Sequence, residues 1–93
     1  MQKRIKLRFT KAFQREVDRL NSVQTKQLYK RLKLFEKNPF HPQLNYHKLH
    51  GDMKGFYSIN ITGDIRAVYF ILDENNDERI IGFTRLGTHS QLY

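Results

Sequence analysis

The stretch GFYSINITGDIRAVYFIL (residues 55–72) decides the fold. It contains two runs rich in aromatic and β-branched residues, joined by the pair Gly63-Asp64, which is typical of a tight turn. The pattern predicts a β-hairpin with strands over 55–62 and 65–72. After the polar turn DENND, the run RIIGFTRL predicts a further strand over 79–86. A short strand over 45–50, ending at Gly51, is expected before the hairpin.

The residues before this hairpin predict one strand and two helices. KRIKLRF (residues 3–9) alternates apolar and cationic side chains, which indicates a half-buried strand. Thr10 can cap a helix in which Phe13, Val17 and Leu20 share one face. A second helix is expected over 23–37, because its apolar residues recur at helical spacing before the stop at Asn38-Pro39: Leu28, Leu32 and Phe35.

The predicted order is β-α-α-β-β-β-β, with both helices ahead of the run of strands. This order predicts an α+β fold in which a helical hairpin packs on a curved antiparallel sheet. The first strand is expected to join that sheet, and the other face of the sheet is expected to stay open for a ligand. No repeat or linker interrupts the chain, so we expect one domain over 1–93.

The charge of the chain predicts a polyanionic partner. Seventeen Lys and Arg residues against nine Asp and Glu give a formal net charge of +8. Three lysines on the second helix, Lys26, Lys30 and Lys33, form a basic row with few acidic partners, which indicates RNA binding; a merely solvated helix face is the alternative. The chain has no cysteine and no long apolar run, so a soluble cytoplasmic protein without a membrane partner is expected.

The residues capable of chemistry are concentrated in the last strands and the tail. Because neighbouring strands of a meander start and end together, Asp64 and Arg66 are expected near Arg85 and His89. RNA cleavage without a metal needs a base for the 2′-hydroxyl, cations for the phosphate and an acid for the 5′-oxygen. Histidine can carry either proton and arginine suits phosphate. Neither a metal site nor a cofactor is expected.

Two motifs carry a family likeness: KLHGDMKGFYSINITGDIRAVYF (residues 48–70) and RLGTHSQLY (residues 85–93). Through them the chain resembles the RelE/ParE superfamily of toxins from bacterial type II toxin-antitoxin systems, most closely the YafQ-type and RelE-type messenger-RNA interferases. The resemblance implies a metal-independent endoribonuclease that cuts messenger RNA in the ribosomal A site and inhibits translation. It also implies a cognate antitoxin as partner.

By position, the resemblance implies that the catalytic residues are His47, Asp64, Arg66, Arg85, His89 and Tyr93. Further RNA contacts are expected from Lys48, His50 and Lys54. We expect Arg66 and Arg85 on the phosphate, His89 as general acid, His47 or Asp64 as base or as an orienting group, and Tyr93 stacked on the RNA. The YafQ pattern has one more histidine, and its nearest position here is predicted at Ile61.

Two other functions fit the same fold. A ParE-like protein would poison DNA gyrase by binding, without cutting RNA, and would be expected to lack the histidine of the tail. A non-catalytic module would bind an antitoxin or RNA through its basic surface alone. The Arg85 and His89 pair favours the ribonuclease.

Overall fold

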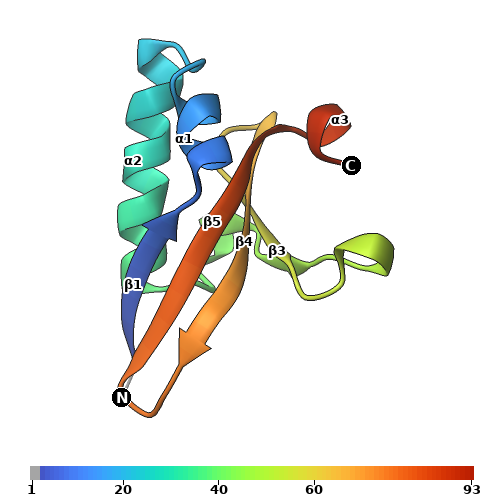
Figure 1. The fold of residues 1–93 in the computed structure, drawn as a ribbon. Helices are drawn as coiled ribbons and strands as arrows, with labels where there is room; N and C mark the ends of the chain where they lie inside the picture. Colours follow the sequence, from blue (N-terminus) through green and yellow to red (C-terminus); the bar gives the residue numbers. More distant parts are fainter. Residues whose placement is uncertain (1–2) are drawn as a thin grey trace.

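The computed structural model describes residues 3–93; Met1 and Gln2, which the predicted domain over 1–93 includes, lie outside the described residues. Two helices, α1 (Lys11–Val17) and α2 (Ser22–Lys37), cover one face of a twisted five-stranded sheet (Figure 1). Thr10 caps α1, as predicted, and Asn21 caps α2 through a capping box with Gln24. Of the helices in the described chain, none is both long and apolar enough to span a bilayer.

The sheet has the strand order β1-β5-β4-β3-β2. β1 (Arg4–Phe9) joins it as predicted, but it runs parallel to β5 (Glu78–Thr88), so the prediction of a wholly antiparallel sheet is wrong. The other neighbouring strands pair antiparallel. The parallel pairing is possible because the chain passes through both helices and three strands before it returns beside β1, which gives a long crossover connection.

The predicted hairpin is confirmed as β3 (Tyr57–Asn60) and β4 (Ile65–Glu74). β3 stops two residues early, because the N–H groups of Ile61 and Thr62 both donate to the carbonyl oxygen of Ile65 and close the turn. β4 and β5 run two residues further than predicted. A bulge between the pairs at Val68 and Tyr69 interrupts their ladder.

The strand expected over 45–50 is reduced to β2 (His47–Lys48). A short 3-10 helix, η1 (Pro42–Leu44), precedes it, and Asn45 takes a left-handed conformation with φ of 47°. A second 3-10 helix, η2 (Gly51–Met53), begins directly after His50. The backbone therefore leaves extended geometry at Asn45, whereas His50 stays extended and the chain turns only after it.

The core lies between the helices and the sheet and is organised around Phe83 of β5. Its ring centroid is 5.6 Å from that of Phe13 on α1, 5.3 Å from that of Phe35 on α2 and 5.3 Å from that of Tyr69 on β4. All four side chains are almost completely buried. This packing fixes the sheet against the helices, and its other face is not covered by α1 or α2.

Acidic residues of the β4–β5 turn hold β1 in place. Glu74 accepts hydrogen bonds from Lys3 at 2.6 Å and from Arg79, and the Lys3 bond, followed by that of Arg79, lowers the pKa of Glu74 below its ordinary value. The hydrogen bond and charge of Lys6 do the same for the pKa of Glu78. These pairs are exposed, so they align the strand ends more than they stabilise the fold.

Candidate active site

The face of the sheet that α1 and α2 leave uncovered is flanked by two projecting segments (Figure 1). One is the loop between β2 and β3, which contains η2; the other is α3 (His89–Leu92), a helix that follows β5 directly. The ring of Phe56 holds the loop to the sheet by packing edge to face on Phe70, whose own ring lies over Gly82. We call the sheet surface between the two segments the open face.

Arg66 lies on β4 and points to the open face, because its neighbours Ile65 and Ala67 point into the core. It is half-buried and pairs across the strands with Asn60 of β3 and Gly87 of β5. Its Nη1 donates a hydrogen bond to Oδ1 of Asn60. Within residues 3–93 no carboxylate forms an ion pair with Arg66, so its positive charge remains available for an anion.

Asn60, not Ile61, is the β3 residue at this site. Ile61, the position nearest to the additional histidine of the family pattern, is fully buried in the core and does not reach the open face. A shift of one residue along a strand moves a side chain to the opposite face. Buried Ile59 lies on the core side, and Asn60 is therefore turned to the open face. In the sequence YSIN (residues 57–60), polar and apolar residues alternate, and this alternation indicates that Asn60 faces away from the core.

The tail turns back against the end of β5, where side-chain atoms of Gln91 and Leu92 lie close to Gly87. Thr88 caps α3 and forms a capping box with Gln91. Gly87 permits this close return, because a Cβ atom at this position would lie only 2.8 Å from Oε1 of Gln91. Gly87 is the strand partner of Arg66, so α3 begins two residues after the position that pairs with Arg66. The rings of His89, the first residue of α3, and Tyr93, which follows the helix, meet edge to face with centroids 4.8 Å apart, and both side chains are exposed.

Asp64 lies at the same end of the sheet as His89. It directly precedes Ile65, which pairs with Thr88, and Thr88 directly precedes His89. The carboxylate of Asp64 is exposed, and its backbone N–H donates to Oγ1 of Thr62. The register therefore brings Asp64, Arg66 and His89 to one corner of the open face, as expected.

His47 reaches the open face from β2. It pairs with Ser58, which shares a face of β3 with Asn60. Its Nδ1 lies 2.9 Å from the carbonyl oxygen of Asn45. Since a carbonyl oxygen can only accept, Nδ1 carries the proton and Nε2 of a neutral ring is free to take one. His47 and His89 stand on opposite sides of Arg66, because β4 lies between β5 and the β3–β2 pair.

In the structure, the side chain of Arg85 is bound by Glu16 and is not grouped with that of Arg66. Its Nε and Nη2 instead bind the carboxylate of Glu16 on α1 at 3.2 to 3.3 Å. Oε1 of Glu16 also accepts from the backbone N–H of Leu86 at 3.0 Å. The charge of Arg85 is therefore paired with Glu16, which the sequence pattern did not indicate as its partner.

The six predicted RNA-binding residues occupy three different places. His50 and Lys54 are exposed at the two ends of η2, beside the open face. Lys48 neighbours His47 but points to the other face of the sheet, so the structure does not bring it to Arg66. The basic row is exposed on α2, on the helix side of the sheet: Lys26, Lys30 and Lys33. No group of three His, Asp or Glu side chains suited to a metal ion is found within residues 3–93.

Comparison with known proteins relates the chain to one group of toxins. A family model described as the bacterial toxin of type II toxin-antitoxin systems, YafQ, matches residues 5–93. A copper-bound mutant toxin from Helicobacter pylori is 31% identical, with 95% of this chain and 98% of that chain covered and a TM-score of 0.66. YafQ from Escherichia coli is 20% identical, with 99% of both chains covered and a TM-score of 0.71.

A third similar structure is a complex. The DinJ-YafQ toxin-antitoxin complex of Escherichia coli contains a chain that is 18% identical, with 97% of this chain and 98% of that chain covered and a TM-score of 0.72. No curated protein matches the sequence.

Proposed function

The chain belongs to the YafQ family of bacterial toxins from type II toxin-antitoxin systems, and from this premise we propose that it is an endoribonuclease that cuts messenger RNA on the ribosome. The observation that carries the proposal is the environment of Arg66. Its guanidinium has no acidic partner within residues 3–93 and is held by Asn60, and Arg66 pairs across the sheet with Gly87, two residues before His89. A fixed, unpaired cation beside a histidine suits a phosphate that gains charge during cleavage.

The proposed reaction uses the 2′-oxygen of the RNA as its nucleophile. In an in-line displacement, the attacking and leaving oxygens lie on opposite sides of the phosphorus. With the scissile phosphate on Arg66, the groups that flank it from opposite sides are His47 and His89. This placement favours His47 as the base and His89 as the acid, and leaves Asp64, at the same corner as His89, to orient that imidazole.

The proposed reaction transfers two protons, forms one bond to phosphorus and breaks another. Nε2 of neutral His47 takes the proton of the 2′-hydroxyl while the 2′-oxygen bonds to phosphorus. Arg66 stabilises the charge on the non-bridging oxygens. The bond to the 5′-oxygen breaks, and protonated His89 donates a proton to that oxygen. The products are a 2′,3′-cyclic phosphate and a 5′-hydroxyl, and no step is assigned to a metal.

The remaining predicted site residues support this centre. Tyr93 packs on His89 and presents an exposed ring on which a base can stack. The Arg85–Glu16 ion pair anchors the end of β5 from which α3 departs, so we assign Arg85 to positioning and not to phosphate contact. His50, Lys54 and the exposed lysines of α2 are assigned to the RNA backbone of message and ribosome.

Membership of the YafQ family also bears on the partner of the protein and on its location in the cell. The antitoxin of such a system must recognise a toxin with a net charge of +8, so we propose an acidic antitoxin whose field complements it. Cutting messenger RNA at the ribosomal A site places the toxin in the cytoplasm.

The test of this function is addition of the purified protein to a translating bacterial extract, followed by mapping of new 5′ ends on the message. We expect cuts at one fixed position within codons. Arg66→Ala should reduce them about 10²- to 10³-fold, the usual effect of removing a group that stabilises developing charge. Arg8→Ala, which removes an exposed arginine of β1, serves as the matched control and should cut normally.

Two results would contradict the proposal. Growth arrest in cells with intact messages in the extract would indicate a gyrase poison. Equal cutting by wild type and Arg66→Ala would show that the open face is not the catalytic site.

A further inference from the structure

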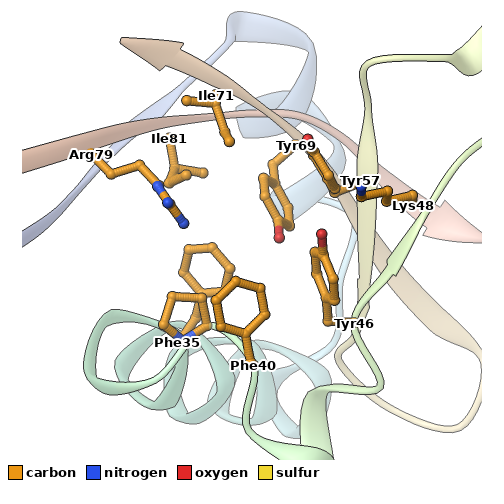
Figure 2. A pocket seen from close by; sticks show the side chains of 10 residues that line it. Phe35, Phe40, Tyr46, Lys48, Tyr57, Tyr69, Ile71, Arg79 and Ile81 are labelled. Atoms are coloured by element: carbon orange, nitrogen blue, oxygen red, sulfur yellow. The ribbon is translucent and has the colours of Figure 1, made fainter. Parts of the chain in front are cut away.

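A hollow on the helix side of the sheet faces away from the open face and is lined mainly by aromatic rings (Figure 2). Its volume is about 200 Å³. The residues that form its walls and offer polar groups are Tyr46, Tyr57, Tyr69, Phe35, Phe40 and Arg79. We call this hollow the tyrosine pocket.

The walls of the tyrosine pocket are held rigid by ring packing. The rings of Tyr46 and Tyr57 stack with centroids 5.6 Å apart, and those of Tyr57 and Tyr69 stack at 5.4 Å. Phe40 meets Tyr46 edge to face, and Phe35 meets Tyr69 in the same way, each at 5.0 Å. The pocket is thus formed before any ligand arrives.

Two phenol groups of the pocket, those of Tyr46 and Tyr69, are hydrogen-bond donors without a partner in the described residues. Tyr69 is only 3% exposed, yet no hydrogen bond to its hydroxyl is found within residues 3–93, and this hydroxyl points into the hollow together with that of Tyr46 (Figure 2). Burial, the largest cause, raises the pKa of both phenols, so they stay protonated and can donate. Solvent still reaches the hydroxyl of Tyr69, since Ser58 Oγ is the one fully buried side-chain atom without a partner in the described residues, so an acceptor that enters the pocket can reach this phenol.

Arg79 adds a cation at the mouth of the pocket. Its Nε and Nη2 donate to Glu74 at 3.0 and 2.6 Å, which leaves Nη1 unused, and its guanidinium points into the hollow (Figure 2). A second hollow of about 180 Å³ shares Phe40 and Arg79 with the pocket and extends to Lys3 and Ile5 of the β1 edge. Together the two hollows form one groove along which Lys3 and Arg79 lie, both of them bound to Glu74.

The size and chemistry of the pocket define its ligand. A volume of 200 Å³ lies below the ~300 to 1,000 Å³ of small-molecule sites, so the pocket suits one side chain. The hydrogen-bond donors at the end of the pocket suit a carboxylate, and the apolar walls suit a short aliphatic stem that carries it. The net charge of +8 favours an acidic polypeptide over other sources of that group.

We propose that the tyrosine pocket receives a glutamate or aspartate side chain from an extended, acidic segment of the antitoxin, whose neighbouring residues occupy the adjoining hollow. The inference rests on the antitoxin partnership proposed above. Since the pocket and the open face lie on opposite faces of the sheet, this contact anchors the antitoxin without using the catalytic residues.

The test is an NMR titration of the full-length, isotope-labelled toxin with the peptide acetyl-Leu-Glu-Leu-amide. Its glutamine counterpart and uridine 3′-monophosphate serve as comparison probes. We expect saturable shifts of the ring signals of Tyr46, Tyr57 and Tyr69 with the glutamate peptide, and about tenfold weaker binding of the glutamine peptide, because a charged acceptor strengthens each hydrogen bond. Tyr69→Phe should weaken the glutamate peptide about tenfold, whereas Tyr29→Phe, which removes an exposed hydroxyl on α2, should not.

Equal binding of both peptides, unchanged tyrosine signals, or a larger shift of the same rings by the nucleotide would overturn the inference. Cleavage measured on the same samples separates it from the proposed function. Tyr69→Phe should cut RNA at the wild-type rate. A toxin that binds the glutamate peptide in the pocket but cuts no RNA refutes the ribonuclease alone, and a toxin that cuts RNA while the peptide leaves the pocket unchanged refutes this inference alone.

Discussion

Replacement of His89 by glutamine is expected to slow cleavage of ribosome-bound messenger RNA by about 10²- to 10⁴-fold, the usual contribution of a general acid. Glutamine preserves much of the size and hydrogen-bonding capacity of the side chain but cannot donate a proton to the departing 5′-oxygen. His89 is exposed and begins the short helix after β5, two residues after Gly87, the strand partner of Arg66. The loss should therefore fall on the rate of the chemical step under single-turnover conditions, with little change in ribosome binding.

The matched control is His41→Gln, which changes a histidine in the loop before η1, where it caps a turn away from the open face. It should cut RNA at the wild-type rate. Both variants should remain folded by circular dichroism, which separates catalysis from folding. Full cleavage by a folded His89→Gln protein would refute the acid role.

Replacement of Phe83 by alanine is expected to lower the free energy of unfolding by about 3 to 5 kcal/mol, the usual cost of removing a buried aromatic side chain. Phe83 is completely buried and touches the rings of Phe13, Phe35 and Tyr69, so its loss leaves a cavity where α1, α2 and β4 meet. Since small domains are stable by only about 5 to 15 kcal/mol, the variant should unfold at a much lower denaturant concentration.

Urea unfolding measured by circular dichroism checks this prediction. Phe40→Ala is the matched control, because Phe40 is 58% exposed and has one edge-to-face partner, Tyr46. It should cost less than about 1.5 kcal/mol. Equal losses in the two variants would show that Phe83 is not the centre of the core.

The sequence predicted the elements that have a regular apolar period. α2, β4 and β5 follow uninterrupted patterns and differ from prediction by one or two residues at their ends. β2 was predicted too long, because the left-handed turn at Asn45 and the 3-10 helix after His50 leave no periodic signal. The direction of β1 beside β5 is set by how the chain packs as a whole, and no local pattern carries it.

The candidate site was predicted in part. Strand pairing alone brings Asp64, Arg66 and His89 to one corner, and this could be inferred from the order of the strands. The Arg85–Glu16 pair joins residues 69 positions apart, so sequence spacing gave no indication of it. Asn60 was not predicted, because its role depends on the cross-strand hydrogen bond to Arg66, which only the folded sheet shows.

The tyrosine pocket shows a different limit of sequence reasoning. Tyr46, Tyr57 and Tyr69 come from the loop before β2, from β3 and from β4, and only the folded sheet stacks them in a row. From sequence, each is an ordinary aromatic residue of a strand or loop. The missing hydrogen-bond partner of Tyr69 can be recognised only in the structure.

The central claim is that this toxin cuts RNA by activating the 2′-oxygen of the message itself. The most direct test is to programme ribosomes with two messages that are identical except for one 2′-deoxynucleotide directly before the mapped cut, and to compare their cleavage by the wild-type protein. We predict cleavage of the ribose message, with a 2′,3′-cyclic phosphate on the upstream fragment, and none at the deoxy position. Equal cleavage of both messages, or of neither, would contradict the account.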